Sequence, residues 1–126
     1  MISQLIKILP ILMITGIPWV FAETLDFNRL ADSIYKAEGG AATRHPYGIM
    51  ARYKHTTPRQ ACLNTIRHKF SDWQRNGSQG QFLTYLASKY CPMGGTLDDG
   101  TCKNWEPNVR AIYSKLAVQD KGMGNG

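Results

Sequence analysis

The sequence predicts an all-α protein, a single domain of four helices with at most one very short β-hairpin near residues 47–53. Apolar residues recur with helical spacing in four stretches, and residues that start or stop helices bound each stretch. The connections between the stretches are short, which favours helix-on-helix packing. A chain of 126 residues, 43% of them hydrophobic, has enough material for one core.

The first predicted helix begins at Asp26 and ends at Glu38, where Gly39 and Gly40 stop it. Its apolar stripe follows the i, i+3, i+4, i+7 pattern of one helix face and consists of Phe27, Leu30, Ala31 and Ile34. Glu38 continues the same stripe one turn later.

Two further helices are introduced by capping-box patterns. Thr57-Pro58-Arg59-Gln60 opens a helix that Asn76-Gly77 ends, and Ser78 to Gln81 opens another that Cys91-Pro92 ends. Their predicted inward faces are Cys62, Leu63, Ile66, Phe70 and Trp73 in the first of the two, and Phe82, Leu83, Leu86, Ala87 and Tyr90 in the second.

The fourth predicted helix starts at about Trp105 and carries core spacing in Val109, Ile112, Tyr113 and Leu116. The last residues are rich in glycine and asparagine, so we expect residues 119–126 to be a flexible tail. The folded domain would then span residues 23–118.

Residues 1–22 have the parts of a signal peptide. Lys7 supplies the basic region, residues 8–20 are apolar, and small residues stand at the two positions that signal peptidase reads before a cut after Ala22. An uncleaved membrane anchor is the alternative, but two prolines and a glycine interrupt the run, which falls short of the roughly 20 apolar residues of a spanning helix. We expect a periplasmic or secreted monomer without stable membrane insertion.

Export would allow one disulfide among Cys62, Cys91 and Cys102, with one thiol left over. Two pairings are open. Cys62 with Cys91 would tie two helices together and stabilise by about 3 kcal/mol, whereas Cys91 with Cys102 would close a Gly-rich loop. We take Cys62–Cys91 as the prediction. The histidines do not lie at ligand spacing with any cysteine pair, so we expect no metal and no cofactor.

The net charge of +6, or +5 once Lys7 leaves with the signal peptide, indicates an anionic partner. For an exported protein, the peptide carboxylates of the cell wall are such a partner. The basic residues are dispersed along the chain and form no concentrated stripe, which disfavours nucleic-acid binding.

Glu38 is the residue whose polarity conflicts with its position. The helical period places it on the buried stripe, at the negative end of the helix dipole. Desolvation and the dipole both favour a protonated carboxyl group, the form that a general acid needs. The alternative is a solvent-exposed residue at a fraying helix end.

Two segments, Ala37-Glu38-Gly39-Gly40 and Tyr47-Gly48-Ile49-Met50, resemble in their order the leading motifs of soluble lytic transglycosylases. In that family a glutamate ends a helix and a Gly-hydrophobic-Met segment floors the cleft. The segments from Leu86 to Pro92 and from Asn104 to Val109 resemble a small exported branch of the lysozyme-like superfamily. Gly39 and Ala51 depart from the pattern, because serine and glutamine commonly stand there.

The resemblance covers roughly residues 30–116 and implies a lysozyme-like domain with Glu38 as both acid and base. It also implies sugar subsites along Tyr47, Gly48 and Ile49, with Tyr90 near the reacting sugar. The implied substrate is the peptidoglycan glycan strand, cut at the MurNAc–GlcNAc β-1,4 bond to leave a 1,6-anhydromuramic end. Small exported enzymes of this kind often serve a secretion or conjugation apparatus.

Asn108 shares the predicted inward face of Ile112 and lies one turn from Trp105. An inward amide there would bind an N-acetyl group of the substrate or cap a neighbouring helix end. Tyr90 is at core spacing, which is typical of a packing residue. Trp73 and Trp105 are either platforms for a sugar ring or core residues, and their helical phase favours the core.

The supply of carboxyl groups separates two reactions. Glycoside hydrolysis commonly uses two flanking carboxyl groups, yet Asp98 and Asp99 lie in a Gly-rich loop and Glu106 stands in the first turn of a helix, where it stabilises the dipole. A lytic transglycosylase needs one, because the nucleophile is a hydroxyl of the substrate itself. We therefore expect a transglycosylase; a lysozyme-type muramidase and a non-catalytic wall-binding module are the alternatives.

Overall fold

The computed structural model describes residues 24–48, 54–95 and 100–123. These residues form four α-helices and two single 3-10 turns, and they contain no strand. In chain order the elements are α2 (Phe27–Ala37), η2 (Gly40–Ala42), η3 (Pro46–Gly48), α3 (Pro58–Arg75), α4 (Phe82–Tyr90) and α5 (Cys102–Met123). The all-α prediction is confirmed. The hairpin considered near residues 47–53 begins as the 3-10 turn η3, and residues 49–53 lie outside the described residues.

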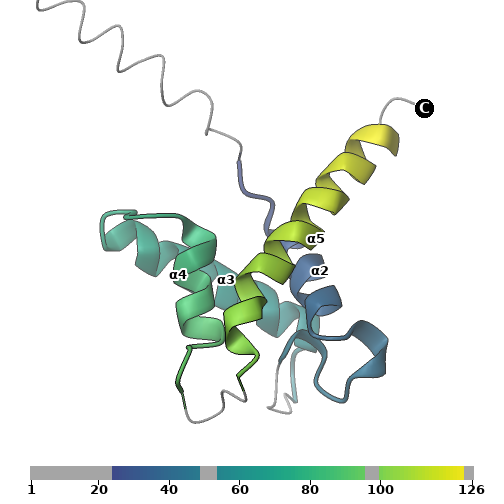
Figure 1. The fold of residues 1–126 in the computed structure, drawn as a ribbon, viewed down its shortest axis with the longest axis horizontal. Coiled ribbons are helices and arrows are strands. Elements are labelled where there is room, and N and C mark those ends of the chain that lie inside the picture. The colour runs from purple at the N-terminus through teal and green to yellow at the C-terminus, as the bar shows by residue number, and fades with distance from the viewer. Residues whose placement is uncertain (1–23, 49–53, 96–99, 124–126) are drawn as a thin grey trace, which may run out of the picture.

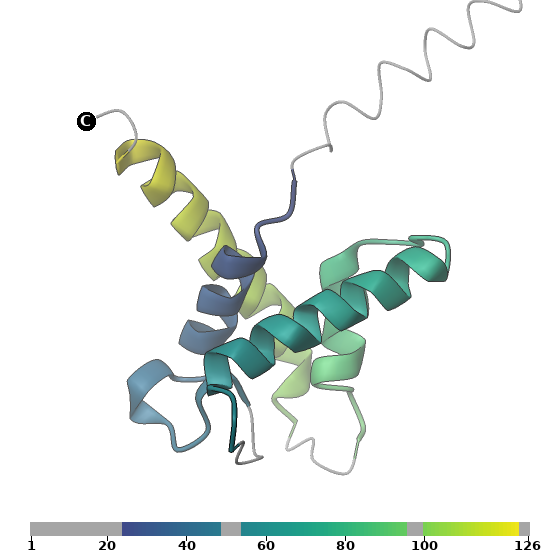
Figure 2. The ribbon, with the colours of Figure 1, turned by 180° about the vertical axis from the view of Figure 1, so that it is seen from behind.

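The four helices contact one another in a closed ring. α2 and α4 each pack against both α3 and α5. α2 and α5 lie side by side, and α3 crosses on the far side in Figure 1 and on the near side in Figure 2. The start of α2 meets Tyr113 and Asp120 of α5, whereas Glu38, just after α2, meets Trp105, so the two helices are antiparallel.

The core lies between the four helices. Its most deeply buried apolar side chains come from all four helices: Leu30, Ala31 and Ile34 of α2, Cys62 and Ile66 of α3, Leu86 of α4, and Val109 of α5. An aromatic cluster of Phe27, Phe70, Trp73 and Phe82 extends this core along α3. The apolar stripes that the sequence predicts therefore meet in one core.

Two helix starts follow from local capping. The carboxylate of Asp26 accepts a hydrogen bond from the Arg29 amide at 3.0 Å, and the Thr57 hydroxyl accepts one from the Gln60 amide at 3.1 Å. Proline at the first position of α3 costs nothing there, since that amide would have no helical partner.

The capping box predicted at Ser78 is wrong. Gly77 and Ser78 both have positive φ, and their amides donate to the carbonyls of Gln74 and Trp73, at 3.1 and 3.0 Å. This pair of bonds is the Schellman motif that ends α3. Ser78 is therefore engaged in stopping one helix and cannot start the next, so α4 begins after Gln81, which makes no side-chain cap.

The flexible tail expected from residue 119 is also wrong for residues 119–123, which are helical. α5 starts at Cys102 and continues to Met123, and residues 124–126 lie outside the described residues. Arg29 donates to Asp120 from Nε at 3.2 Å and from Nη2 at 3.0 Å, and its guanidinium lies 5.3 Å from the centroid of the Tyr113 ring. These contacts with α2 hold the last turns of α5 in place.

The disulfide joins Cys91 to Cys102, with Cα atoms 5.3 Å apart, so the predicted Cys62–Cys91 bridge is wrong. Cys91 caps the end of α4 and Cys102 is the first residue of α5, so their bridge joins the end of one helix to the start of the next. Cys62 is free and fully buried, with the Tyr90 hydroxyl 3.8 Å from its Sγ. Burial raises the pKa of the Cys62 thiol to about 11.

No helix within the described ranges is long and apolar enough to cross a membrane. The predicted signal peptide, residues 1–22, lies outside the described residues.

Candidate active site

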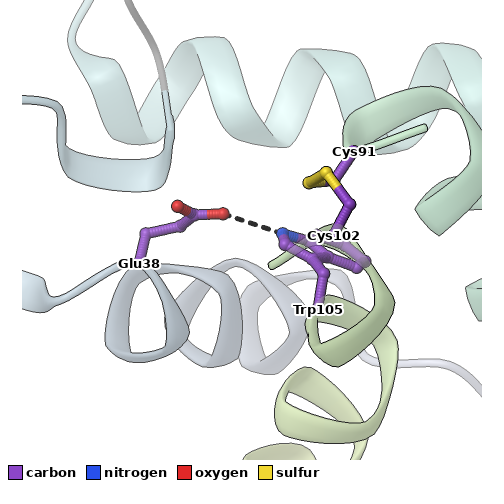
Figure 3. Close-up of a disulfide and its surroundings, with 4 residues drawn as sticks. All are labelled: Glu38, Cys91, Cys102 and Trp105. Carbon is purple, nitrogen blue, oxygen red and sulfur yellow. Dashed lines mark hydrogen bonds between the residues drawn. A yellow bond between two sulfur atoms is a disulfide. The ribbon is translucent and has the colours of Figure 1, made fainter. Parts of the chain in front are cut away.

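Glu38 is the residue that ends α2. Its amide donates to the carbonyl of Ile34 at 2.9 Å, and Gly39 then turns the chain at a φ of +101°. The half-buried side chain points across to the first turn of α5, as Figure 3 shows. The helix ends at Ala37, one residue before the predicted end, and Glu38 is its C-cap. The side chain of Glu38 turns toward α5 but is only half-buried.

Trp105 of α5 meets this carboxyl group. Its indole Nε1 donates to Oε1 of Glu38 at 2.8 Å (Figure 3), and the indole ring stacks on Tyr90 with ring centroids 5.1 Å apart. Trp105 is 6% exposed, so the prediction that it belongs to the core is correct. Core spacing alone did not assign it to the site, although a buried indole N–H usually has a partner and could have pointed there.

Gly48 closes the site from the η3 turn. A Cβ built on this residue would lie 3.3 Å from Cε1 of Tyr90 and 3.4 Å from Cδ and Oε1 of Glu38. Tyr47 and Gly48 have φ of +63° and +68°, a left-handed pair in which the non-glycine residue costs about 1–3 kcal/mol. The backbone is thus held directly against the carboxyl group of Glu38.

The strained turn is fixed from two sides. The Tyr90 hydroxyl donates to the carbonyl oxygen of Tyr47, whose side chain is buried. Hydrogen bonding to Tyr47 and to Asp32 raises the pKa of Arg59, which also forms an ion pair with Asp32. Arg59 is a second residue that the sequence did not point to, because its place in the capping box carries no sign of a contact with Tyr47.

Four of the residues singled out from the sequence are therefore brought together: Glu38, Tyr47, Gly48 and Tyr90. Ile49 and the two loop aspartates, Asp98 and Asp99, lie outside the described residues. Asn108 is not part of the group. It is exposed, because the buried stripe of α5 follows Trp105 and Val109, and Asn108 lies at its margin. The predicted inward amide is wrong.

Glu38 differs from the other described carboxyl groups in its partner. Asp26, Asp32, Asp72, Glu106 and Asp120 each lie within 4.0 Å of an arginine or lysine nitrogen. Among the residues that the structure describes, the partner of Glu38 is instead a neutral indole. None of the ion pairs among the described residues includes Glu38.

Glu106 is accounted for by other contacts. It accepts from the Thr84 hydroxyl and from the Arg110 guanidinium, both at 3.0 Å. A cavity of about 520 Å³ between α4 and α5 has Glu106, the disulfide and Met93 on its walls, but Glu38 is not among its described lining residues. In the same described ranges, no three His, Cys, Asp or Glu side chains gather closely enough to hold a metal ion.

Gly48→Ala tests the close approach of backbone and carboxyl group. The new methyl group would press on Glu38 and Tyr90, so we expect any activity that depends on the Glu38 carboxyl group to fall roughly 10- to 100-fold. Gly80→Ala is the matched control, since Gly80 has nearly the same φ, +69°, and its added methyl group would meet nothing within 4 Å. Both variants should lose about 1–2 kcal/mol of stability from the left-handed backbone, and only the first should lose activity. Equal activity of the two would contradict the proximity of Gly48 to the reacting group.

Comparisons with protein families, with curated proteins and with solved structures found no match for this chain.

Proposed function

We propose that this protein is a lysozyme-like enzyme that cleaves peptidoglycan glycan strands as a lytic transglycosylase, with Glu38 as its acid and base. The observation that carries the proposal is the environment of Glu38. It is a half-buried carboxyl group at a helix end that accepts an indole N–H, forms no ion pair among the described residues, and lies beside the turn in which Tyr47 has a strained left-handed backbone. Strain and an uncompensated carboxyl group together are typical of a catalytic centre.

The reaction needs one proton donor that later becomes the acceptor. Neutral Glu38 gives its proton to the glycosidic oxygen as the bond from that oxygen to the anomeric carbon of MurNAc breaks. The resulting carboxylate then takes the proton of the muramic 6-hydroxyl while the oxygen of that hydroxyl bonds to the same anomeric carbon. The 1,6-anhydro ring forms, Glu38 is neutral again, and no water is consumed. Because the nucleophile is tethered to the substrate, a high effective concentration replaces a positioned water.

A lysozyme-type hydrolase is the second candidate. It would need a second carboxyl group across the cleft from Glu38. Glu106 already bonds to Arg110 and Thr84, which argues against it in that role. Asp98 and Asp99 lie outside the described residues. The single carboxyl group that forms no ion pair in the described part of the chain favours the transglycosylase.

The proposed location is outside the cytoplasm, in the periplasm or the medium. The Cys91–Cys102 disulfide supports it, because disulfides persist in oxidising compartments. The proposed partner is the cell wall, whose peptide carboxylates suit a chain with an excess of basic residues. Service to a secretion or conjugation apparatus is part of the same proposal.

The products of digestion test the function. We expect purified peptidoglycan treated with the protein to release 1,6-anhydromuropeptides, each about 18 mass units lighter than its hydrolysed counterpart because one water is not added, as measured by mass spectrometry. Glu106→Gln should leave the products and the rate unchanged within about twofold, since its surface ion pair contributes little.

Other products would point elsewhere. Reducing-end muropeptides, lost in Glu106→Gln, would establish a hydrolase that uses both Glu38 and Glu106. Binding to insoluble wall without release of any soluble fragment would establish the non-catalytic module instead.

A further inference from the structure

The Glu38–Trp105 hydrogen bond has a direction that matters for proton transfer. An indole nitrogen only donates, so it can bind an oxygen that carries a lone pair but cannot accept the proton of the acid. The 2.8 Å bond therefore occupies Oε1. When Glu38 is neutral, its proton belongs on Oε2, and when Glu38 is ionised the same bond remains favourable.

The indole is itself held in place. Its ring stacks on Tyr90 with an interplanar angle of 27°, and the Tyr90 hydroxyl is fixed on the carbonyl of Tyr47. The Cys91–Cys102 disulfide adds a covalent link between the residue after Tyr90 and the first residue of α5. Figure 3 shows the disulfide beside the tryptophan at the start of that helix. The tryptophan has little freedom to rotate its N–H away from Glu38.

We propose that Trp105 is a positioning residue for Glu38: its N–H holds Oε1, so that the protonated Oε2 is the oxygen presented to the glycosidic bond. A lysine or arginine in this place would also orient the carboxyl group, but its positive charge would favour the ionised form and oppose the acid step. A neutral donor fixes the geometry without that cost. The inference rests on the proposed function for its catalytic meaning, while the contact itself can be measured without any substrate.

The indole N–H resonances of ¹⁵N-labelled full-length protein report the contact directly. Trp105→Phe and Trp73→Phe assign the signals of these two tryptophans by their loss. Trp73 is the matched control, because its Nε1 donates to the backbone carbonyl of Gln79, with no contact to Glu38. In Glu38→Gln and Glu38→Ala we expect the Trp105 resonance to move and the Trp73 resonance to stay. A Trp105 signal unmoved in both Glu38 variants would overturn the inference.

Kinetics on soluble peptidoglycan fragments then measure what the contact does. We expect Trp105→Phe to lower kcat on the order of 10- to 100-fold with KM within about twofold of wild type. Trp73→Phe, the same chemical change elsewhere in the core, should leave both within about twofold. In a Glu38→Gln background, Trp105→Phe should cause no further loss, because there is no acid left to position.

Trp105 is buried, so its phenylalanine variant is accepted only if its circular dichroism matches wild type. If it does not fold, β-(3-benzothienyl)alanine at position 105 keeps the bicyclic shape and removes only the N–H. Two results would overturn the positioning role. In one, Trp105→Phe raises KM by as large a factor as it lowers kcat. In the other, Trp105→Phe lowers the residual rate further in the Glu38→Gln background. If the resonance moves as expected but wild type digests nothing, the contact stands and the proposed function fails.

Discussion

Replacing Glu38 with glutamine is expected to lower the rate of peptidoglycan cleavage roughly 1,000-fold, the range over which general acid–base groups contribute. Glutamine is nearly the same size, and its amide oxygen can still accept from Nε1 of Trp105, which lies 2.8 Å from the present carboxylate oxygen. The variant loses the proton and keeps the packing. We therefore expect an unchanged circular dichroism spectrum and a melting temperature close to that of wild type.

A shorter acid separates chemistry from geometry. Glu38→Asp keeps a carboxyl group but withdraws it from Trp105 by one methylene, so its activity should fall between those of wild type and Glu38→Gln. Release of soluble muropeptides at a fixed protein concentration measures all three proteins. Should Glu38→Gln retain more than about a tenth of the wild-type rate, Glu38 would not be the acid.

Removing the Cys91–Cys102 bridge has the largest expected effect on stability. The bridge joins residues 11 positions apart, and the chain-entropy account gives about 3 kcal/mol for a loop of that size. We expect the free energy of unfolding of the Cys91→Ser/Cys102→Ser double variant to be lower by this amount. Urea denaturation measures it, and the variant should unfold at a lower urea concentration than wild type. Activity should fall as well, because the bridge anchors the start of α5, which carries Trp105.

The pairing itself is checked with Cys62→Ala. This variant keeps the bridge, so its oxidised form should contain no thiol that an alkylating reagent can label after unfolding. The wild type should show one such thiol, and only after unfolding, because Cys62 is fully buried and its pKa of about 11 keeps it protonated near neutral pH. Two labelled thiols in oxidised Cys62→Ala would mean that Cys62 belongs to the bridge after all.

The helices and most of their ends could be predicted from the sequence because they depend on near neighbours. The Thr57 cap reaches only to Gln60, and the stop after Glu38 needs only the two glycines that follow. The failure at Ser78 has its cause on the same scale. The two residues after α3 can either finish that helix or start the next one, and the backbone amides of Gly77 and Ser78 are satisfied by the first choice.

Predictions that required distant partners succeeded less often. The helical period places Asn108 beside the inward face of α5, but the side chains that enter the core there are Trp105 and Val109, and Asn108 is exposed. Beyond residue 118, α5 contacts α2 through Asp120 and Arg29, which lie 91 residues apart in the sequence. No local pattern in a Gly-rich segment could indicate that contact.

The sequence by itself determined the helical class, the apolar faces and the placing of Glu38 at a helix end, since a helix forms from bonds and side-chain spacings that span about four residues or fewer. Only the tertiary structure decided what surrounds that carboxyl group. Glu38 and Trp105 are 67 residues apart. Cys91 pairs with Cys102 and not with Cys62 because the packing brings the end of α4 next to the start of α5. Helix packing places an indole, a glycine backbone and a tyrosine around one acid. The spacing of these residues in the sequence does not indicate that they are in contact.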